Sequence, residues 1–397
     1  FFLYTLLGSV FILIVMIGLY SSAIDPVQTA IQAGLVQQAS DVAPKVLEQL
    51  WQMLALNQIG PEDYVHTFNL LYLTDAQNYI PGSILYKGQI GLPFGDSARL
   101  VAFLLLLIGF GIKLPVVPVH TWLPDAHVEA PTAISVVLAG ILLKIGGYGI
   151  LRIAYPVFPE GALHFSWWMG LFGVISIVYA AYVAMGTHNL KKLIAYSSVS
   201  HMGFVLLGIA TLTSEGISGA LFQMFSHGII SSMLFLVAGV IYFRTGNLEI
   251  ESYKGLFSKM PVYASLVAVA FFASLGLPGF SGFIAELFVF LGAFKSQAVN
   301  QLVPMWMAVV ATLGLILAAG YYLWTLQRMY LGKFRTMPDI NPGHLKDVGF
   351  RELFMLLPLA GIALVLGIFP SLFLPPDLLI GAKRLFSGLS VVTTSKS

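Results

Sequence analysis

Long apolar runs constrain this chain more than any other feature of its sequence. A helix that crosses a lipid bilayer needs about 20 mainly apolar residues. The runs are continuous rather than alternating, which favours helices over the strands of a membrane barrel. We identify nine such segments, at 1–20, 99–119, 131–153, 167–186, 193–212, 217–243, 262–294, 306–331 and 354–374. The sequence therefore predicts an all-α fold, a polytopic bundle of transmembrane helices.

The composition excludes several other classes of protein. The chain is 58% hydrophobic and only 10% charged, with 20 Lys+Arg and 18 Asp+Glu. So few charges cannot cover the surface of a soluble enzyme, nor form the basic patch of a nucleic-acid binder. With no cysteine, the chain has no thiolates for iron–sulfur clusters, zinc or disulfides. It also contains no dinucleotide fingerprint, Walker A motif or H-E-x-x-H motif.

One region differs from the apolar runs. Residues 21–98 carry seven carboxylates and two lysines, and within 26–56 the apolar residues recur at helical spacing. We expect one or two amphipathic helices there, serving as a packing segment or as a docking surface for a neighbouring subunit. The predicted regions are a transmembrane helix (1–20), an acidic extramembrane loop (21–98), an eight-helix transmembrane bundle (99–374) and a tail (375–397). Because the sequence begins with Phe1, we expect it to start partway through a longer protein.

The distribution of Lys and Arg predicts the orientation. If residue 1 lies on the cytoplasmic side, the short loops on that side hold ten basic residues and the short outer loops hold three. Cytoplasmic loops are enriched in Lys and Arg, so the acidic 21–98 loop is expected to face outside. The ten are Lys191, Lys192, Arg244, Lys254, Lys259, Arg328, Lys333, Arg335, Lys346 and Arg351.

Three charged residues fall inside apolar segments: Lys113, Lys144 and Glu286. A charge at the bilayer centre costs about 2.5–3.5 kcal/mol on insertion scales. Such residues must therefore face the bundle interior, a water-filled cavity or one another. Both structural ion pairing and proton transfer are compatible with these positions.

Two of these charges lie beside a predicted helix break. Pro115 and Pro118 follow Lys113, and the Gly-Leu-Pro-Gly run at 276–279 precedes Glu286. Proline removes a backbone hydrogen bond and clashes with the preceding turn. Paired discontinuous helices are typical of transporters built from two related halves. We therefore predict broken helices and inverted structural repeats.

Two histidines, His201 and His227, fall inside further apolar segments. Histidine titrates near neutral pH, and desolvation favours the neutral forms of lysine and glutamate. Side chains of these types on adjacent helices can form a lateral proton relay, with water filling the gaps. For the histidines alone, a satisfied core position is an equally good interpretation.

Three motifs resemble those of a known family. They are HTWLPDAHVEAPT (120–132), LKKLIAYSSVSHMG (190–203) and LKIGGYG (143–149). They look like the signatures of the antiporter-like membrane subunits of respiratory complex I, the NADH:quinone oxidoreductases. The resemblance is strongest to the chain M (chain 4) type, because chain L carries a lysine at the position of Glu286. Mrp-type cation/proton antiporter subunits share this ancestry.

The resemblance implies a proton channel driven by distant quinone reduction. It implies that Lys113 is the lysine of the broken helix, that Lys144 is the central lysine, and that Glu286 is the exit carboxylate. His201 and His227 would be intermediate relay positions. The glutamate that pairs with Lys113 in the family is expected upstream of residue 1. The resemblance covers the chain to about residue 370, apart from the 21–98 loop, which is longer than usual.

The 120–132 motif has two interpretations. His120, Asp125, His127 and Glu129 either help protons reach the channel from the cytoplasm, or the last three cap the next helix and close a turn. Glu352, next to Arg351 at a predicted helix start, is expected to be a helix-terminus charge.

The resemblance also predicts cofactors and partners. We expect no cofactor and no metal on this chain, with NADH, FMN, iron–sulfur clusters and quinone on partner subunits. The expected partners are the other membrane subunits of complex I, lipid and protons. The expected location is the bacterial cytoplasmic membrane, or an organellar inner or thylakoid membrane. The alternatives are an Mrp-type sodium/proton antiporter subunit, a ferredoxin- or hydrogenase-linked complex, and a structural membrane scaffold.

Overall fold

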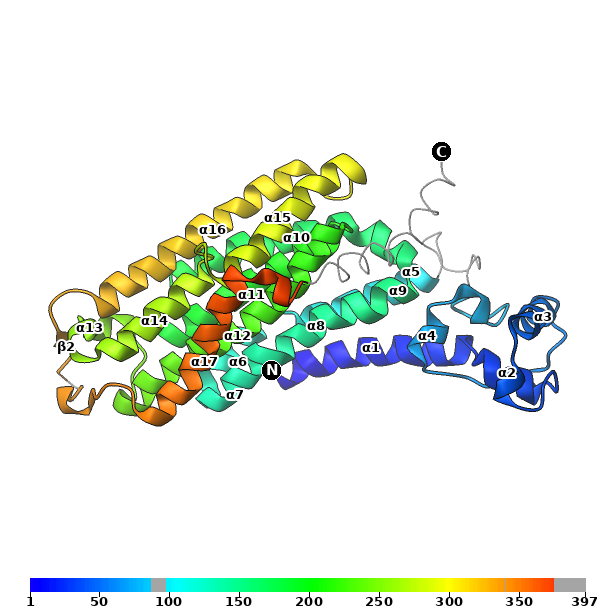
Figure 1. The fold of residues 1–397 in the computed structure, drawn as a ribbon, viewed down its shortest axis with the longest axis horizontal. Coiled ribbons are helices and arrows are strands. Elements are labelled where there is room, and N and C mark those ends of the chain that lie inside the picture. The colour runs from blue at the N-terminus through cyan, green and yellow to red at the C-terminus, as the bar shows by residue number, and fades with distance from the viewer. Residues whose placement is uncertain (87–97, 339, 375–397) are drawn as a thin grey trace. The chain divides into compact units, whose positions relative to one another are not determined.

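The computed structural model describes residues 1–86, 98–338 and 340–374, and nearly all regular structure in them is helical (Figure 1). The longer helices are α1 (Phe2–Ser22), α3 (Pro44–Ala55), α5 (Ala98–Lys113), α6 (Trp122–Glu129), α10 (Pro159–Met185), α11 (Leu190–Ala210), α12 (Ser214–Thr245), α14 (Pro261–Ser274), α15 (Ser281–Val299), α16 (Met305–Thr325) and α17 (Phe350–Ile368). The short helices are α2 (Pro26–Gln32), α4 (Leu70–Leu73), α7 (Thr132–Val137), α8 (Leu143–Gly149), α9 (Tyr155–Val157) and α13 (Leu256–Lys259).

Within the described ranges, eight helical segments are long and apolar enough to cross a membrane. One of them, Thr132–Val157, is a continuous run that contains α7, α8 and α9 and the two π-helical turns between them, Leu138–Leu142 and Ile150–Ala154. A third π-helical turn, Leu326–Tyr330, continues α16. The chain is a multi-pass integral membrane protein, and the predicted all-α bundle is confirmed.

The structure corrects two of the nine predicted segments. The run at 99–119 is not one span, because α5 ends at Lys113 and α6 begins only at Trp122. The run at 262–294 is two helices, α14 and α15, separated by residues 275–280. Both interruptions fall where proline and glycine predicted them, so the predicted discontinuous helices are confirmed.

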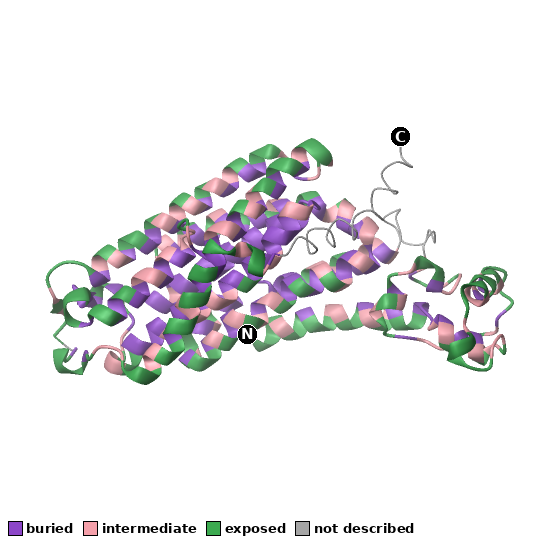
Figure 2. Ribbon diagram, viewed as in Figure 1, coloured by how far each residue is buried: buried purple, intermediate pink, exposed green. Residues whose placement is uncertain are grey.

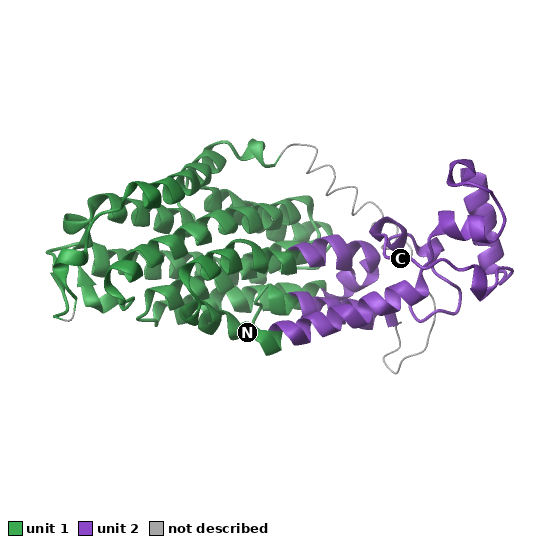
Figure 3. Cartoon of the chain, turned by 90° about the horizontal axis from the view of Figure 1, so that it is seen from below, with its two compact units in different colours: residues 1–4, 111–147, 166–397 green, residues 5–110, 148–165 purple. Residues whose placement is uncertain are grey.

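The chain is divided into two compact units (Figure 3). The first comprises residues 1–4, 111–147 and 166–397, and α11 lies at its centre. In the most apolar stretch of 18 residues in α11, 94% is buried inside the protein (Figure 2). The corresponding shares are 17% in α1 and 22% in α17. Small residues let the helices approach closely: a side chain at Gly203 of α11 would collide with the Gly173 carbonyl of α10. Polar side chains on α11 are therefore held in the driest part of this unit.

Two short strands lie in the same unit. β1 (Tyr253–Lys254) pairs antiparallel with β2 (Arg335–Thr336), with Lys254 opposite Arg335. This ribbon joins the loop after α12 to the loop after α16.

The second unit comprises residues 5–110 and 148–165. A side chain at Gly109 of α5 would lie 2.7 Å from the Gly8 carbonyl of α1, so glycine permits this helix contact. Arg99 is buried in the unit, donates to the Leu85 carbonyl and to Glu160, and lies over the Tyr79 ring. Burial raises the pKa of the Tyr79 hydroxyl, and the Arg99 guanidinium opposes that shift.

The amphipathic helices predicted after residue 26 are present as α2 and α3. The buried face of α3 presents Leu50 and Leu54, which form a small apolar core with Ile24, Ala30 and Ile59. The role of this segment and the predicted region boundaries remain predictions. The tail at 375–397 lies outside the described residues.

Candidate functional site: a buried row of titratable side chains

Helices α11 and α12 supply the centre of the candidate site. Asn189 caps α11 through its side-chain oxygen, and Thr213 caps α12 in the same way. His201 lies halfway along α11, and Gln223 and His227 lie four residues apart on α12, which puts them on one face. All three side chains are at least 95% buried.

Four of the five predicted relay residues lie in one row. Lys144 Nζ is 2.8 Å from His227 Nδ1. The His227 and His201 rings follow, with centroids 5.5 Å apart. His201 Nδ1 is 3.5 Å from Glu286 Oε1. Residues separated by up to 142 positions in the sequence thus form a continuous series from α8 through α12 and α11 to α15.

A π-helical turn, Leu138–Leu142, positions Lys144 at one end of this row. A π-turn displaces carbonyls from the regular helical hydrogen-bond pattern. Lys144 Nζ donates to one of them, the Ala139 carbonyl, as well as contacting His227. Glycines bring the two helices together here, since a side chain at Gly228 would lie 3.0 Å from the Gly140 carbonyl. The local backbone therefore holds the ammonium against the histidine.

The break between α14 and α15 positions Glu286 at the other end. Gly276 in the break has a φ of +75°, which glycine adopts without strain. A side chain there would lie 2.4 Å from Glu286 Oε2. Glu286 is only 4% exposed. Its carboxylate lies between Gly276 of the break and His201.

The sequence interpretation missed several polar partners of the row. Gln223 Nε2 lies 3.2 Å from His201 Nδ1, and Ser274 Oγ lies 3.2 Å from His201 Nε2. Ser274 Oγ is 2.7 Å from the Tyr322 hydroxyl, which donates to Ser197 Oγ. The position of Gln223, one helical turn before His227, was a signal in the sequence. Nothing in the sequence pointed to Tyr322, on α16.

Lys113, the fifth predicted relay residue, does not join the row. It ends α5, is partly buried, and makes no hydrogen bond or ion pair with any residue that the structure describes. Its role remains a prediction.

The 120–132 motif forms α6 and the turn after it. His127 is fully buried and stacks on Phe235, with ring centroids 4.3 Å apart, and neither ring nitrogen has a hydrogen-bond partner among the described residues. His120 is also buried, edge-on to Tyr179. Asp125 and Glu129 are exposed.

The predicted capping role of this motif is wrong. No side chain caps α7. The turn is instead held by Ser135 Oγ, which donates to the His127 carbonyl, and by Lys191 Nζ, which donates to the Ala130 carbonyl. The role of the motif in proton access remains a prediction.

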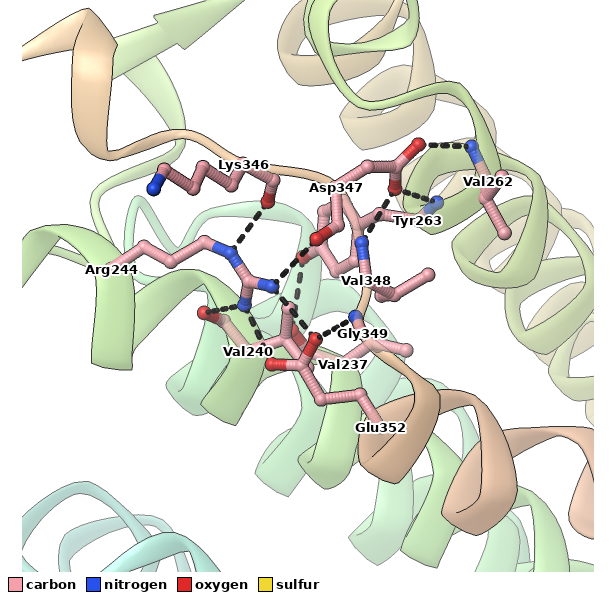
Figure 4. Close-up of polar contacts among 10 residues, drawn as sticks. All are labelled: Val237, Val240, Arg244, Val262, Tyr263, Lys346, Asp347, Val348, Gly349 and Glu352. Carbon is pink, nitrogen blue, oxygen red and sulfur yellow. Dashed lines mark hydrogen bonds and ion pairs between the residues drawn. The ribbon is translucent and has the colours of Figure 1, made fainter.

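Glu352 caps a helix, as predicted, and its cationic partner is Arg244 (Figure 4). The Gly349 amide donates to Glu352 at the start of α17. Arg244, at the end of α12, donates to both Glu352 oxygens at 2.8 and 2.7 Å and to three carbonyls, those of Val240, Lys346 and Asp347. This cluster ties three helices together, because Asp347 accepts from two amides at the start of α14.

Among the described residues, no group of three or more His, Cys, Asp or Glu side chains could hold a metal ion. The buried row consists of titratable side chains.

A bundle of apolar helices, interrupted near two charged residues and enclosing a row of titratable side chains, has the architecture of a membrane transporter. The chain belongs to the NADH:quinone oxidoreductase/Mrp antiporter transmembrane family, which matches residues 66–315.

Curated relatives agree with this family. Subunit M of the NADH-quinone oxidoreductase from Rhodobacter capsulatus is 45% identical over 70% of this chain and 52% of the relative. Subunit M from Rickettsia felis is 38% identical over 94% of this chain and 62% of the relative. Chain 4 of the NAD(P)H-quinone oxidoreductase from Thermosynechococcus vestitus is 43% identical over 69% of this chain and 51% of the relative. The chain thus spans only part of the length of these relatives.

Two solved structures share the fold. Respiratory complex I from Thermus thermophilus contains a chain that is 27% identical, with a TM-score of 0.68 over 97% of this chain and 74% of that chain. The Mrp complex from a Dietzia species contains one that is 21% identical, with a TM-score of 0.70 over 96% of this chain and 66% of that chain.

Proposed function

We propose that this chain is the proton-translocating membrane subunit of an NADH:quinone oxidoreductase, of the subunit M (chain 4) type, in a bacterial cytoplasmic membrane. The observation that carries the proposal is the row Lys144–His227–His201–Glu286. Every side chain in the row can gain or lose a proton. Adjacent members of the row are close enough to exchange a proton directly or through one water molecule. The names of the relatives support the complex I assignment over the Mrp alternative.

In this mechanism a proton crosses the row in steps. The Lys144 ammonium donates to His227 Nδ1, with which it is already in contact. In this proposal a water molecule carries the proton between the two rings, whose centroids are 5.5 Å apart and which share no direct hydrogen bond. His201 then passes its proton to Glu286, at the broken helix. The neighbouring hydroxyls of Ser274 and Tyr322 can reorient as the His201 charge changes, which stabilises both protonation states.

The driving reaction lies elsewhere in this proposal. With no cysteine and no dinucleotide fingerprint, this chain lacks the ligands for iron–sulfur clusters and a recognisable NADH site. We therefore assign NADH, FMN, the clusters and quinone to partner subunits, which are the other membrane and peripheral subunits of the complex. Redox work there must change the protonation of the row through the intervening subunits.

The test replaces one end of the row in the full-length chain within its complex. Glu286→Gln keeps the shape of the side chain but removes its titratable proton. In inverted membrane vesicles, we expect NADH oxidation and proton uptake to fall together by at least tenfold, since a positioned proton donor or acceptor is worth about 10²–10⁴-fold. Lys144→Gln should have a similar effect.

Matched controls come from an ion pair outside the row. Lys295 Nζ contacts Glu215 Oε1 at 2.6 Å, and Lys295 is 46% exposed. Glu215→Gln and Lys295→Gln should leave both activities near the unsubstituted level. If Glu286→Gln assembles and leaves NADH oxidation and proton uptake unchanged, the relay proposal fails. In that case sodium/proton exchange tests the Mrp alternative, and its absence favours the structural scaffold.

A further inference from the structure

A cavity of about 750 Å³ lies at the ribbon formed by β1 and β2, and no residue of the proton row lines it. It is lined by both strands and by the turn that follows α16. The lining residues with charged or hydroxyl side chains are Glu251, Ser252, Tyr253, Lys254, Arg328, Arg335 and Thr336. Three cations and one carboxylate therefore face this space.

The carboxylate neutralises only one of the cations. Glu251 contacts Arg328 and also lies 3.5 Å from His188 Nδ1. The side chains of Lys254 and Arg335, by contrast, are exposed and make no hydrogen bond or ion pair with any residue in the described parts of the chain. The cavity thus keeps two uncompensated positive charges.

The positive charges of Lys254 and Arg335 repel each other across the ribbon. Lys254 and Arg335 are direct cross-strand partners, so their side chains emerge on the same face. Like charges at directly opposite positions destabilise a strand pair. The backbone leaves little freedom, since Gly255 packs against the main chain at 332–334, closely enough that a side chain at Gly255 would collide with it. An anion between the two cations would turn their repulsion into a shared attraction.

The surroundings of the cavity favour an anion that carries hydrocarbon chains. Arg328 stacks on Trp324, with its guanidinium carbon 4.4 Å from the ring centroid, and Trp324 is 44% exposed. Exposed tryptophan near a helix end is typical of the membrane–water interface. From there an exposed apolar stripe continues along α16 through Leu323, Ile316 and Leu313. The basic cavity and the apolar stripe are therefore continuous.

We propose that this cavity binds the phosphate-bearing headgroup of an anionic phospholipid, whose acyl chains lie along the exposed stripe of α16. Lys254 and Arg335 contact the phosphate from two sides, and Arg328 bridges it to Trp324. The predicted orientation places this loop among the basic cytoplasmic loops, where anionic headgroups attract such clusters. The site goes beyond the proposed proton transport, because none of its residues belongs to the row.

Photo-crosslinking of the intact complex tests the site. The complex is placed in phosphatidylcholine vesicles that contain a phosphatidylglycerol probe with a photoreactive group next to its headgroup. A phosphatidylcholine probe with the same group is the lipid control. Peptide mapping then measures labelling of residues 324–338. We expect labelling by phosphatidylglycerol to exceed labelling by phosphatidylcholine.

Substitutions supply the matched comparison. One basic group near an anionic surface is worth about fivefold in affinity, so Lys254→Gln with Arg335→Gln should lower labelling on the order of 30-fold. Lys259→Gln removes an exposed charge outside the cavity lining and should leave labelling unchanged. Without anionic lipid, the double variant should melt at a higher temperature than the unsubstituted complex, because it lacks the cross-strand repulsion.

Three results would overturn the proposal. Equal labelling of the double variant and the unsubstituted complex would show that the cations do not hold the headgroup. Complete competition by inorganic phosphate would identify a site for a free anion rather than a lipid. A carbodiimide crosslink from Lys254 to a carboxylate of another subunit, together with no lipid labelling, would identify a protein partner instead.

Discussion

The two helix breaks of this chain provide their charged residues with different surroundings. After α14, Glu286 is 4% exposed, and its carboxylate contacts His201 beside the break. After α5, Lys113 is partly buried and has no polar partner in the described ranges. Both charges were predicted from the same pattern, a charge next to proline and glycine. The difference teaches that this pattern locates a break but does not say which element satisfies the charge.

Within the described residues, no side chain neutralises Lys113. The family resemblance implies a glutamate on an upstream helix for this lysine. Glu286 needs no such help, since α11 supplies His201 and the break supplies Gly276 beside its carboxylate. We therefore expect the second break to depend on packing within this chain and the first to tolerate changes.

The largest effect should come from the anchor of α14, the first helix of the second break. Arg244→Ala leaves Glu352 without its cation and removes five hydrogen bonds from one guanidinium. Loss of one partner of a mostly buried pair costs about 3 kcal/mol. Thermal denaturation of the complex in detergent should show a lower melting temperature. Arg351→Ala, next to Glu352 but exposed, is the matched control and should change little.

A pair of glycine substitutions contrasts the packing of the two breaks. A side chain at Gly282 would lie 2.4 Å from the Ala273 carbonyl, whereas one at Gly111 would meet nothing within 4 Å. Gly282→Ala should therefore destabilise the protein by about 2 kcal/mol through overpacking. Gly111→Ala, in a helix, should stabilise it by up to about 1 kcal/mol. Equal melting temperatures for Gly282→Ala and Gly111→Ala would contradict the predicted difference in packing between the two breaks.

Gly276→Ala should have a smaller effect on stability but a clear effect on transport. A residue other than glycine at this positive φ costs about 1–2 kcal/mol, and the new methyl group would displace the Glu286 carboxylate. The rates of NADH oxidation and proton uptake in inverted vesicles should fall together. Gly279, also at positive φ but with nothing within 4 Å of its added side chain, is the control. Gly279→Ala should carry the backbone strain without the loss of uptake.

The smallest effect on stability is expected at the first break. Lys113→Gln removes a charge that has no partner within the described residues, so the free energy of unfolding should change by no more than about 0.5 kcal/mol. The melting temperature of the complex measures this change. A strong destabilisation would mean that Lys113 forms an ion pair with another part of the assembly.

The sequence predicted the helical class and both breaks, because apolar runs and proline or glycine act locally. The run at 262–294 was nevertheless counted as one segment, because the apolar pattern continues on both sides of the break. The sequence also did not identify the cationic partner of Glu352. Arg244, the actual partner, is more than 100 residues away, and only the packing of α12 against α17 brings the two together.

The candidate site was partly predictable for the same reason. Lys144, His201, His227 and Glu286 are rare polar residues in apolar helices, and the cost of burying each one indicated that they would meet. Tyr322 and Ser274 were missed because tyrosine and serine are common in such helices. The π-helical turn that positions Lys144 has no recognisable pattern in the sequence.

The central claim is that the row works as one pathway, and proton uptake by a double variant tests it directly. His227→Phe and Glu286→Gln are each introduced alone and then together in the full-length chain, and the rate of NADH-driven proton uptake is measured in inverted vesicles. Residues that act as one unit give non-additive losses. We predict that proton uptake by the double variant equals that of whichever single variant has the lower uptake. If the two losses multiply, His227 and Glu286 act independently, and the single-row account is contradicted.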